Sequence, residues 1–229
     1  MRSTLSSPAV VRLLDRLYAR VAAEDEPARQ RVRALEARLG RRLSQEQRYE
    51  AYGPAPLAIK RDVGKLLYLL TVSRRPRTVV EFGASLGIST LHLASALRDC
   101  GGGSLITTEL LPGKSDAARA NLAEAGLDDL VELRVGDALN TLAQLDRDVD
   151  MAFLDGRNDL YLDVLGLLEP HLGSAALVVA DLSADDPDLI PYLEHVRDPA
   201  NGYVSVELPL AAGVEVSVRV SPAKEPPQR

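Results

Sequence analysis

The sequence predicts an α/β fold with a doubly wound, mostly parallel seven-stranded sheet, an antiparallel C-terminal strand and extra N-terminal helices. From about residue 78 to 196, short apolar runs alternate with helical patterns, as they do when right-handed crossovers join parallel strands. Five of these runs end in a polar residue or glycine, and two later runs alternate with a period of two. A stretch without strand patterns precedes them all.

Two helices are predicted in that N-terminal stretch. Apolar residues from Val10 to Val21 recur at i, i+3, i+4 and i+7, so the first helix begins near Ser7 and Pro8. Pro27 is expected to open a second helix, which Gly40 ends or bends. We expect residues 1–56 to form a helical cap or lid.

The domain division follows from this pattern. A turn-rich hinge over residues 52–56 leads into a helix predicted from Leu57 to Val72, with Leu66, Leu67, Leu69 and Leu70 buried. Residues 57–220 are expected to form the cofactor-binding domain. The Pro-rich tail, 221–229, is expected to be disordered.

Composition excludes several classes of function. The chain of 229 residues is 46% hydrophobic, enough for one sizeable domain. Its net charge of −6 argues against a nucleic-acid partner. Six arginines between Arg29 and Arg42 interleave with apolar residues at helical spacing, which indicates a solvated helix face. The single cysteine, Cys100, and the absence of a long apolar span favour a cytoplasmic protein without a membrane partner.

The most informative segment is the run 79–89, Val-Val-Glu-Phe-Gly-Ala-Ser-Leu-Gly-Ile-Ser. It has the form of a strand, a tight turn and the start of a helix. Gly83 and Gly87 permit backbone angles closed to other residues and let a ligand approach the main chain. The run is therefore typical of a loop that binds a nucleotide-type cofactor.

Acidic residues follow the next strand patterns at their carboxyl ends. The run 104–109 ends in Glu109, which is placed to accept hydrogen bonds from a ribose diol. The run 131–138 closes on Gly136-Asp137-Ala138, and the runs 150–156 and 175–181 carry Asp155 and Asp181 near their ends. In an open parallel sheet these ends share one edge, where ligands bind.

These motifs together resemble the class I S-adenosylmethionine-dependent methyltransferases, specifically the small bacterial O-methyltransferases similar to catechol O-methyltransferase. The matching segments are 81–89, Thr-Glu-Leu 108–110, Gly-Asp-Ala 136–138, Leu-Asp-Gly 154–156 and Val-Ala-Asp 179–181. The resemblance implies a Rossmann-like fold and S-adenosylmethionine as cofactor. It implies that the cofactor contacts Glu81, Gly83, Ser85, Gly87, Ser89, Glu109, Leu110, Gly136, Asp137, Ala138 and Asp155.

The metal site of the catechol-type relatives is altered in this chain. Asp155 and Asp181 match the aspartates that bind Mg²⁺ in those relatives, but Leu182 replaces their third ligand, an Asn. Asn158 stands where they tend to carry Lys. Two carboxylates can hold a hydrated Mg²⁺ only weakly, so we expect no metal ligands here, Asp155 as the catalytic residue and Asp181 as a cap or a partner of Ser183.

We therefore expect a metal-independent O-methyltransferase of secondary metabolism, acting on a small-molecule hydroxyl and homodimeric by analogy. The alternative is a protein that binds the cofactor but has lost or repurposed methyl transfer, as a cyclase, isomerase or binder.

Other readings fit less well. Gly83-x-Ser-x-Gly87 matches a hydrolase nucleophile elbow, but His171 and His195 are poorly placed to complete a triad. A nicotinamide enzyme would need a middle glycine where Ser85 stands. Nucleic-acid methylation is disfavoured because Asp155-Gly156 replaces an Asn-Pro-Pro-Tyr-like segment.

Overall fold

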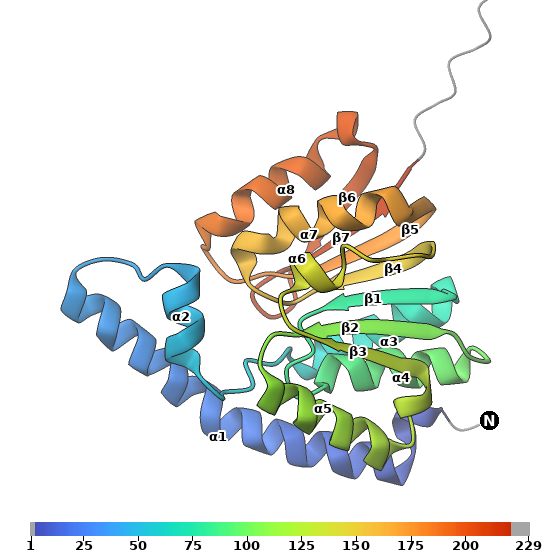
Figure 1. Ribbon diagram of the computed structural model, residues 1–229, viewed down its shortest axis with the longest axis horizontal. Helices are drawn as coiled ribbons and strands as arrows, with labels where there is room; N and C mark the ends of the chain where they lie inside the picture. The colour runs from blue at the N-terminus through green and yellow to red at the C-terminus, as the bar shows by residue number, and fades with distance from the viewer. Residues whose placement is uncertain (1–2, 221–229) are drawn as a thin grey trace, which may run out of the picture.

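A single twisted sheet organises the computed structural model, which describes residues 3–220 (Figure 1). The strands are β1 (Thr78–Phe82), β2 (Ser104–Glu109), β3 (Val131–Val135), β4 (Val149–Leu154), β5 (Leu172–Asp181), β6 (Tyr203–Leu208) and β7 (Val214–Arg219). Their spatial order is β3-β2-β1-β4-β5-β7-β6. The first five strands are parallel, while β7 pairs antiparallel with both β5 and β6. The predicted sheet is confirmed.

Helices cover both faces of the sheet. They are α1 (Pro8–Leu39), α2 (Gln45–Tyr52), α3 (Arg61–Arg74), α4 (Ile88–Asp99), α5 (Pro112–Ala125), α6 (Ala138–Thr141), α7 (Tyr161–Leu168) and α8 (Ile190–Arg197). One apolar core joins α1, α3, α4 and α5 to one face, and a second joins α6, α7 and α8 to the other. Figure 1 shows this three-layer arrangement, with α2 and the end of α1 projecting beyond the sheet.

The N-terminal region differs from the two-helix prediction, because α1 is one helix of 32 residues that runs through Pro27. The helix begins where expected, with Ser7 as its N-cap, and ends at Gly40, whose φ is +62°. An internal proline costs about 3 kcal/mol in helix propensity. The apolar stripe nevertheless continues past it, since Ala28 and Val32 are both buried, and this packing keeps the helix intact.

Two further expectations were wrong in detail. The short helix α2, started by a capping box between Ser44 and Gln47, was not predicted because it carries no buried apolar stripe. The following helix, α3, starts at Arg61 rather than Leu57, and Leu69 is exposed. Its buried stripe instead includes Val63 and Leu67.

The tail expected to be disordered lies outside the described residues. Within residues 3–220, every helix is too short or too polar to cross a lipid bilayer.

Candidate functional site

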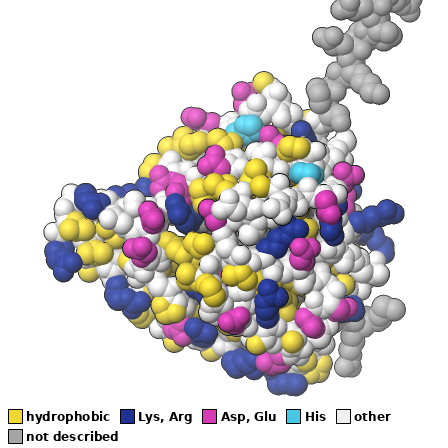
Figure 2. All heavy atoms as spheres, in the orientation of Figure 1, with side chains coloured by type: hydrophobic (Ala, Val, Ile, Leu, Met, Phe, Trp, Pro, Cys, Tyr) yellow, Lys and Arg dark blue, Asp and Glu magenta, His cyan; other side chains and the backbone are white. Residues whose placement is uncertain are grey.

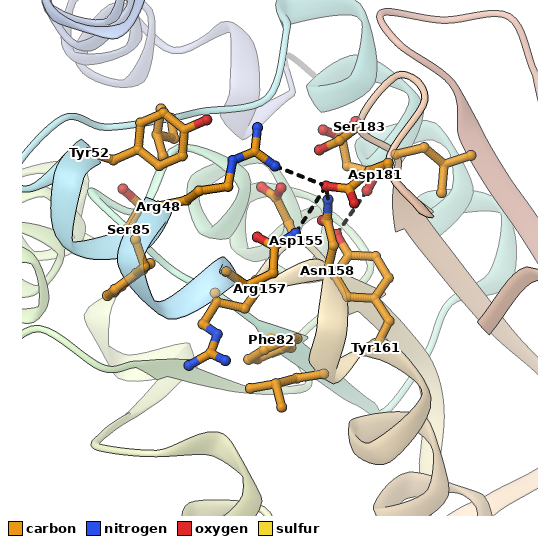
Figure 3. Close-up of a pocket in the computed structure, with 18 of the residues that line it drawn as sticks. Arg48, Tyr52, Phe82, Ser85, Asp155, Arg157, Asn158, Tyr161, Asp181 and Ser183 are labelled. Carbon is orange, nitrogen blue, oxygen red and sulfur yellow. Dashed lines mark hydrogen bonds and ion pairs between the residues drawn. The ribbon is translucent and has the colours of Figure 1, made fainter. Parts of the chain in front are cut away.

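One large cavity of about 1070 Å³ opens at the carboxyl ends of the parallel strands. Loops that follow β1, β2, β3, β4 and β5 form its floor, and α1, α2 and the loop before α3 form its outer wall. Figure 3 shows Arg48 and Tyr52 from α2 facing the side chains that follow the strands. A cavity of this size at this edge is where doubly wound α/β proteins bind ligands.

The glycine loop packs closely against the end of β4. Gly83 has a φ of +99°, and a Cβ there would lie 2.5 Å from the carbonyl oxygen of Asp155. Ser85 also has a positive φ, of 47°. Its hydroxyl donates to the carbonyl oxygen of Pro56 at 2.6 Å, so the loop is tied to the segment before α3. Only glycine fits position 83, as the sequence predicts.

Glu109 is the centre of the hydrogen bonds at the β2 end. Its Oε2 accepts from the backbone N–H of Ser85 at 2.9 Å, and its Oε1 accepts from the N–H of Leu111 at 2.8 Å. The Tyr49 hydroxyl, from α2, donates to the same Oε1 at 3.2 Å. A carboxylate so placed holds the glycine loop and presents an acceptor to the cavity.

The structure divides the predicted cofactor residues into two sets. Gly83, Ser85, Glu109, Leu110, Gly136, Asp137, Ala138 and Asp155 line the cavity. Gly87 and Ser89 lie outside the wall of this cavity, at the start of α4, where Gly87 is the N-cap.

Glu81 requires a correction, because it is fully buried behind the loop instead of lining the cavity. Its Oε2 accepts from the hydroxyls of Thr90 and Thr107, each at 2.6 Å. Burial raises the pKa of its carboxyl group, although these hydroxyls oppose the shift. Glu81 therefore fixes α4 to the sheet.

Asp155 and Asp181 come together because their strands are neighbours in register. Leu154 of β4 pairs with Ala180 of β5, so the next residues stand side by side at the sheet edge. Burial raises the pKa of Asp155, and the Asp181 charge raises it further. Burial also raises the pKa of Asp181 to about 7, against the opposing charges of Arg29 and Lys60.

The expected contact of Asp181 with Ser183 is not among the hydrogen bonds of residues 3–220. Asp181 Oδ1 is instead buried without a hydrogen-bond partner in this part of the chain. The backbone carbonyl of Asp181 accepts from the Tyr161 hydroxyl at 2.8 Å, which fixes the end of β5 (Figure 3).

The protein offers two carboxylates at this point but not the third side-chain ligand of the catechol-type relatives. Leu182 is buried in the apolar core and pairs through its N–H with the carbonyl of Gly213 at 2.9 Å. The side-chain amide of Asn158 donates to Asp186 at 2.8 Å. Residues 3–220 contain no group of three or more His, Cys, Asp or Glu side chains placed to hold a metal. Mg²⁺ prefers six oxygen ligands in octahedral geometry.

Asp186 joins the α1–α2 region to the loop that follows β5. Its side chain is 4% exposed. It accepts from Arg42 at 2.5 Å, Asn158 at 2.8 Å, Gln45 at 3.1 Å and Arg48 at 3.5 Å. Acidic and basic side chains accordingly lie side by side where the projecting helices meet the body of the molecule (Figure 2). We call these five residues the Asp186 clasp.

The sequence did not reveal this clasp, although five of the six clustered arginines are exposed, as the interpretation of a solvated face expects. Arg29, Arg33 and Arg42 all line the cavity. The available signals were the acidic residues around Asp186 and the basic ones around Arg42, but their pairing depends on the tertiary fold.

A second tie joins α1 to the cavity through Asp25, which is 7% exposed. Its carboxylate accepts from the backbone N–H groups of Leu57 at 2.9 Å and Ala58 at 3.2 Å. Leu57 has a φ of 49°, which is unusual for a residue with a branched side chain. Asp25 thus holds a strained turn that lines the cavity.

Comparison with known proteins adds evidence independent of this geometry. Residues 80–181 match a family model described as a methyltransferase domain. A catechol O-methyltransferase from Niastella koreensis is 34% identical over 155 residues, which are 66% of this chain and 68% of that protein. A catechol O-methyltransferase from Mycobacterium tuberculosis is 40% identical over 101 residues, so the match spans 43% of this chain and less than half of that protein, 44%.

Solved structures show the same likeness. The O-methyltransferase TomG from Streptomyces achromogenes, determined in complex with S-adenosylmethionine, superposes with a TM-score of 0.62 at 27% identity. The superposition covers 72% of this chain and 82% of TomG.

Proposed function

Because the chain belongs to the class I S-adenosylmethionine-dependent O-methyltransferases, we propose that it methylates a hydroxyl group of a small molecule without a metal ion. The observation that carries this proposal is the β4–β5 register. It puts the carboxylates of Asp155 and Asp181 together at the cavity floor, beside the largely buried Leu182, whose side chain cannot coordinate a metal ion.

The protein's own residues account for binding of the cofactor. The loop over Gly83 and Ser85 offers a close main-chain approach, and Glu109 offers a carboxylate to the ribose hydroxyls. Asp137 and Ala138 line the same wall, beside the expected adenine position. When bound, S-adenosylmethionine supplies an electrophilic methyl group on a positively charged sulfur.

The role left to the protein in the transfer step is alignment and proton removal. Asp155 lies at the cavity floor between the glycine loop and Asp181, where its carboxylate can accept a proton from the acceptor hydroxyl. Tyr52 and Arg48 line the outer side of the cavity (Figure 3). Holding the hydroxyl in line with the methyl group provides the larger part of the rate enhancement.

The alternative, a cofactor binder with repurposed chemistry, is favoured by Asn158. Asn158 stands where the catechol-type relatives tend to carry a lysine, so the protein has no lysine base at that position. The Asn158 amide instead donates to Asp186. The two functions share cofactor binding and differ in methyl transfer.

Calorimetry with S-adenosylmethionine and with NAD⁺, each with Mg²⁺ or EDTA, tests the cofactor and the metal together. We expect S-adenosylmethionine to bind equally in both conditions, and NAD⁺ not to bind. Methylation of hydroxyl acceptors is then assayed in EDTA. Activity restored only by Mg²⁺ would refute metal independence, and binding without methylation of any hydroxyl compound would favour the alternative.

The proposal extends to the setting of the enzyme. We propose a homodimer in the cytoplasm that serves secondary metabolism, with residues 1–56 forming the cap over the acceptor. Light scattering of the purified protein tests the dimer.

A further inference from the structure

Basic side chains are unusually frequent in the cavity wall, and most of them are already paired. Seven line it, and four of these form ion pairs with acidic residues: Arg33 with Glu26, Arg42 with Asp186, Arg48 with Asp186 and Glu36, and Arg157 with Asp159. The other three, Arg29, Lys60 and Lys114, have neither an ion pair nor a side-chain hydrogen bond within residues 3–220.

These three free cations lie at two ends of the cavity. Lys114 stands at the Glu109 end, with its ammonium 5.8 Å from the centre of the Tyr49 ring. Arg29 reaches the cavity from α1, one turn beyond Asp25, and Lys60 stands just before α3 without a capping bond. Arg29 and Lys60 line the same cavity as Asp155 and Asp181, where transfer would occur, and their charges oppose the rise in the pKa of Asp181.

Arg29 and Lys60 form no ion pair with the carboxylates that line the same end of the cavity in the described part of the chain. Asp155 and Asp181 have no side-chain hydrogen bonds in the described chain, and neither does the exposed Asp185, whereas Asp186 is engaged by the clasp. The sulfonium and ammonium groups of S-adenosylmethionine outnumber its single carboxylate. Its binding therefore adds one positive charge to a cavity in which Arg29, Lys60 and Lys114 have no ion pair within residues 3–220.

We propose that the methyl acceptor is a hydroxy acid, whose carboxylate is bound by Arg29 and Lys60 beside the hydroxyl that is methylated. This inference rests on the proposed function. A guanidinium group binds a carboxylate through two parallel hydrogen bonds, and an ammonium group adds a flexible third donor. A single negative charge suits the site better than a phosphate dianion, because Asp155 and Asp181 lie close by and repel additional charge.

The remaining wall fits the carbon skeleton of such an acceptor. Val32, Leu57 and Leu182 contribute apolar surface to the same cavity, and Tyr52 contributes a ring. A small aromatic or aliphatic hydroxy acid can therefore lay its skeleton on this surface while its charged end meets Arg29 and Lys60.

A competing role for the two cations is to offset the charges of Asp155 and Asp181 alone. In that case their removal would affect charged and neutral acceptors alike. Specific recognition of a carboxylate instead requires that the loss be confined to acidic acceptors, and this difference sets the design of the test.

The test compares hydroxybenzoic, hydroxycinnamic and aliphatic hydroxy acids with their methyl esters, which keep the hydroxyl but lose the charge. Calorimetry measures their binding to the complex of the protein with S-adenosylhomocysteine, and kcat/KM is measured for each pair. For at least one skeleton we expect the acid to exceed its ester by about tenfold or more in both quantities. Esters equal to or better than every acid, or binding of none of the acids, would overturn the proposal.

Variants then assign the preference to side chains. Arg29→Met and Lys60→Met are expected to reduce the acid-to-ester ratio to about three or less, with little change for the ester. Arg31→Met and Lys65→Met are matched controls on the same helices, at exposed positions outside the cavity wall. Equal losses for acid and ester would show the charge-offsetting role and refute carboxylate recognition.

Affinity for S-adenosylhomocysteine separates this inference from the proposed function. A wild-type protein that does not bind it would contradict the family-based function itself. A protein that binds it and methylates neutral and acidic acceptors equally would contradict only the inference about the acceptor. If Arg29→Met weakens S-adenosylhomocysteine binding more than acid binding, the guanidinium serves the cofactor and the assignment of Arg29 is wrong.

Discussion

Replacement of Asp186 by alanine tests whether the α1–α2 region is held over the acceptor side of the cavity. The substitution removes the acceptor for four side chains of the Asp186 clasp, three of which come from residues 42–48. Although burial alone would raise it, the bonds from Arg42, Asn158 and Gln45 hold the pKa of Asp186 below its usual value. The side chain is therefore an anion that accepts hydrogen bonds from two cationic and two amide side chains.

The expected effect can be estimated from these contacts. A hydrogen bond to a charged group is worth about 1.5–3 kcal/mol, and breaking a fully buried ion pair costs about 3–5 kcal/mol. Arg42 and Arg48 are 36% and 21% exposed and can be rehydrated when Asp186 is removed. We therefore expect Asp186→Ala to lower the free energy of unfolding by about 2–3 kcal/mol.

The functional effect is expected on the acceptor alone. Part of the lost free energy would otherwise hold the α1–α2 region in place against the acceptor. If that part is about 1.4 kcal/mol, the acceptor KM is expected to rise about tenfold. Urea unfolding and steady-state kinetics measure the two quantities, and calorimetry should show cofactor affinity within about twofold of wild type.

Asp188→Ala is the matched control. Asp188 belongs to the same loop and is 38% exposed, with one hydrogen bond to Gln45 at 2.6 Å and an ion pair of 3.7 Å with Arg42. Its loss should cost under about 1 kcal/mol. Equal destabilisation by the two substitutions, or a loss of cofactor affinity in Asp186→Ala, would refute this account of the clasp.

Three further changes have defined outcomes. Glu109→Gln should weaken S-adenosylmethionine binding about tenfold or more in calorimetry, because a charged acceptor is lost; unchanged affinity would contradict its ribose role. Asp25→Ala should lower stability by about 1–3 kcal/mol in urea unfolding and weaken cofactor binding, because two N–H groups lose their acceptor; cofactor affinity equal to that of wild type would show that the turn at Leu57 needs no such support. Burial lowers the pKa of His92, so the contribution of this side chain to the free energy of unfolding is complete above about pH 6.5 and declines as the pH falls below that value. His92→Gln should flatten this decline in urea unfolding measured against pH. An unaltered slope of stability against pH would assign the decline to another group.

Much of the fold could be predicted because its strands are continuous apolar runs that end in recognisable residues. β2 has the predicted bounds, and the two later runs of period two form the strands β6 and β7, with β7 antiparallel to its neighbours. The main failures concern helices whose identity depends on tertiary contacts. Pro27 indicates a helix start by local rules. The buried side chains of Ala28 and Val32 nevertheless pack against the rest of the protein, and the helix continues through Pro27.

The candidate site divides in the same way. Residues next to the strand ends, such as Glu109 and Asp155, could be placed from sequence because parallel strands bring their carboxyl ends to one edge. Glu81 could not, because an acid within a strand points to whichever face the register dictates. Arg29 and the Asp186 clasp also escaped prediction, since nothing local says which side chains of residues 29–48 meet a loop more than a hundred residues away.

The acceptor side and the cofactor side of the cavity come from separate parts of the chain. The side chains assigned here to the acceptor come mostly from residues 29–60, a single uninterrupted segment, whereas those assigned to the cofactor begin at residue 83. A recombination event, or a designed chimaera, that exchanges this one segment would bring a new acceptor wall to an unchanged cofactor half. Such grafts must keep the turn at Leu57 and Ala58 that binds Asp25, and the partners of Asp186, because those contacts dock the segment. Diversification by segment exchange is thus open to this architecture without rebuilding its sheet.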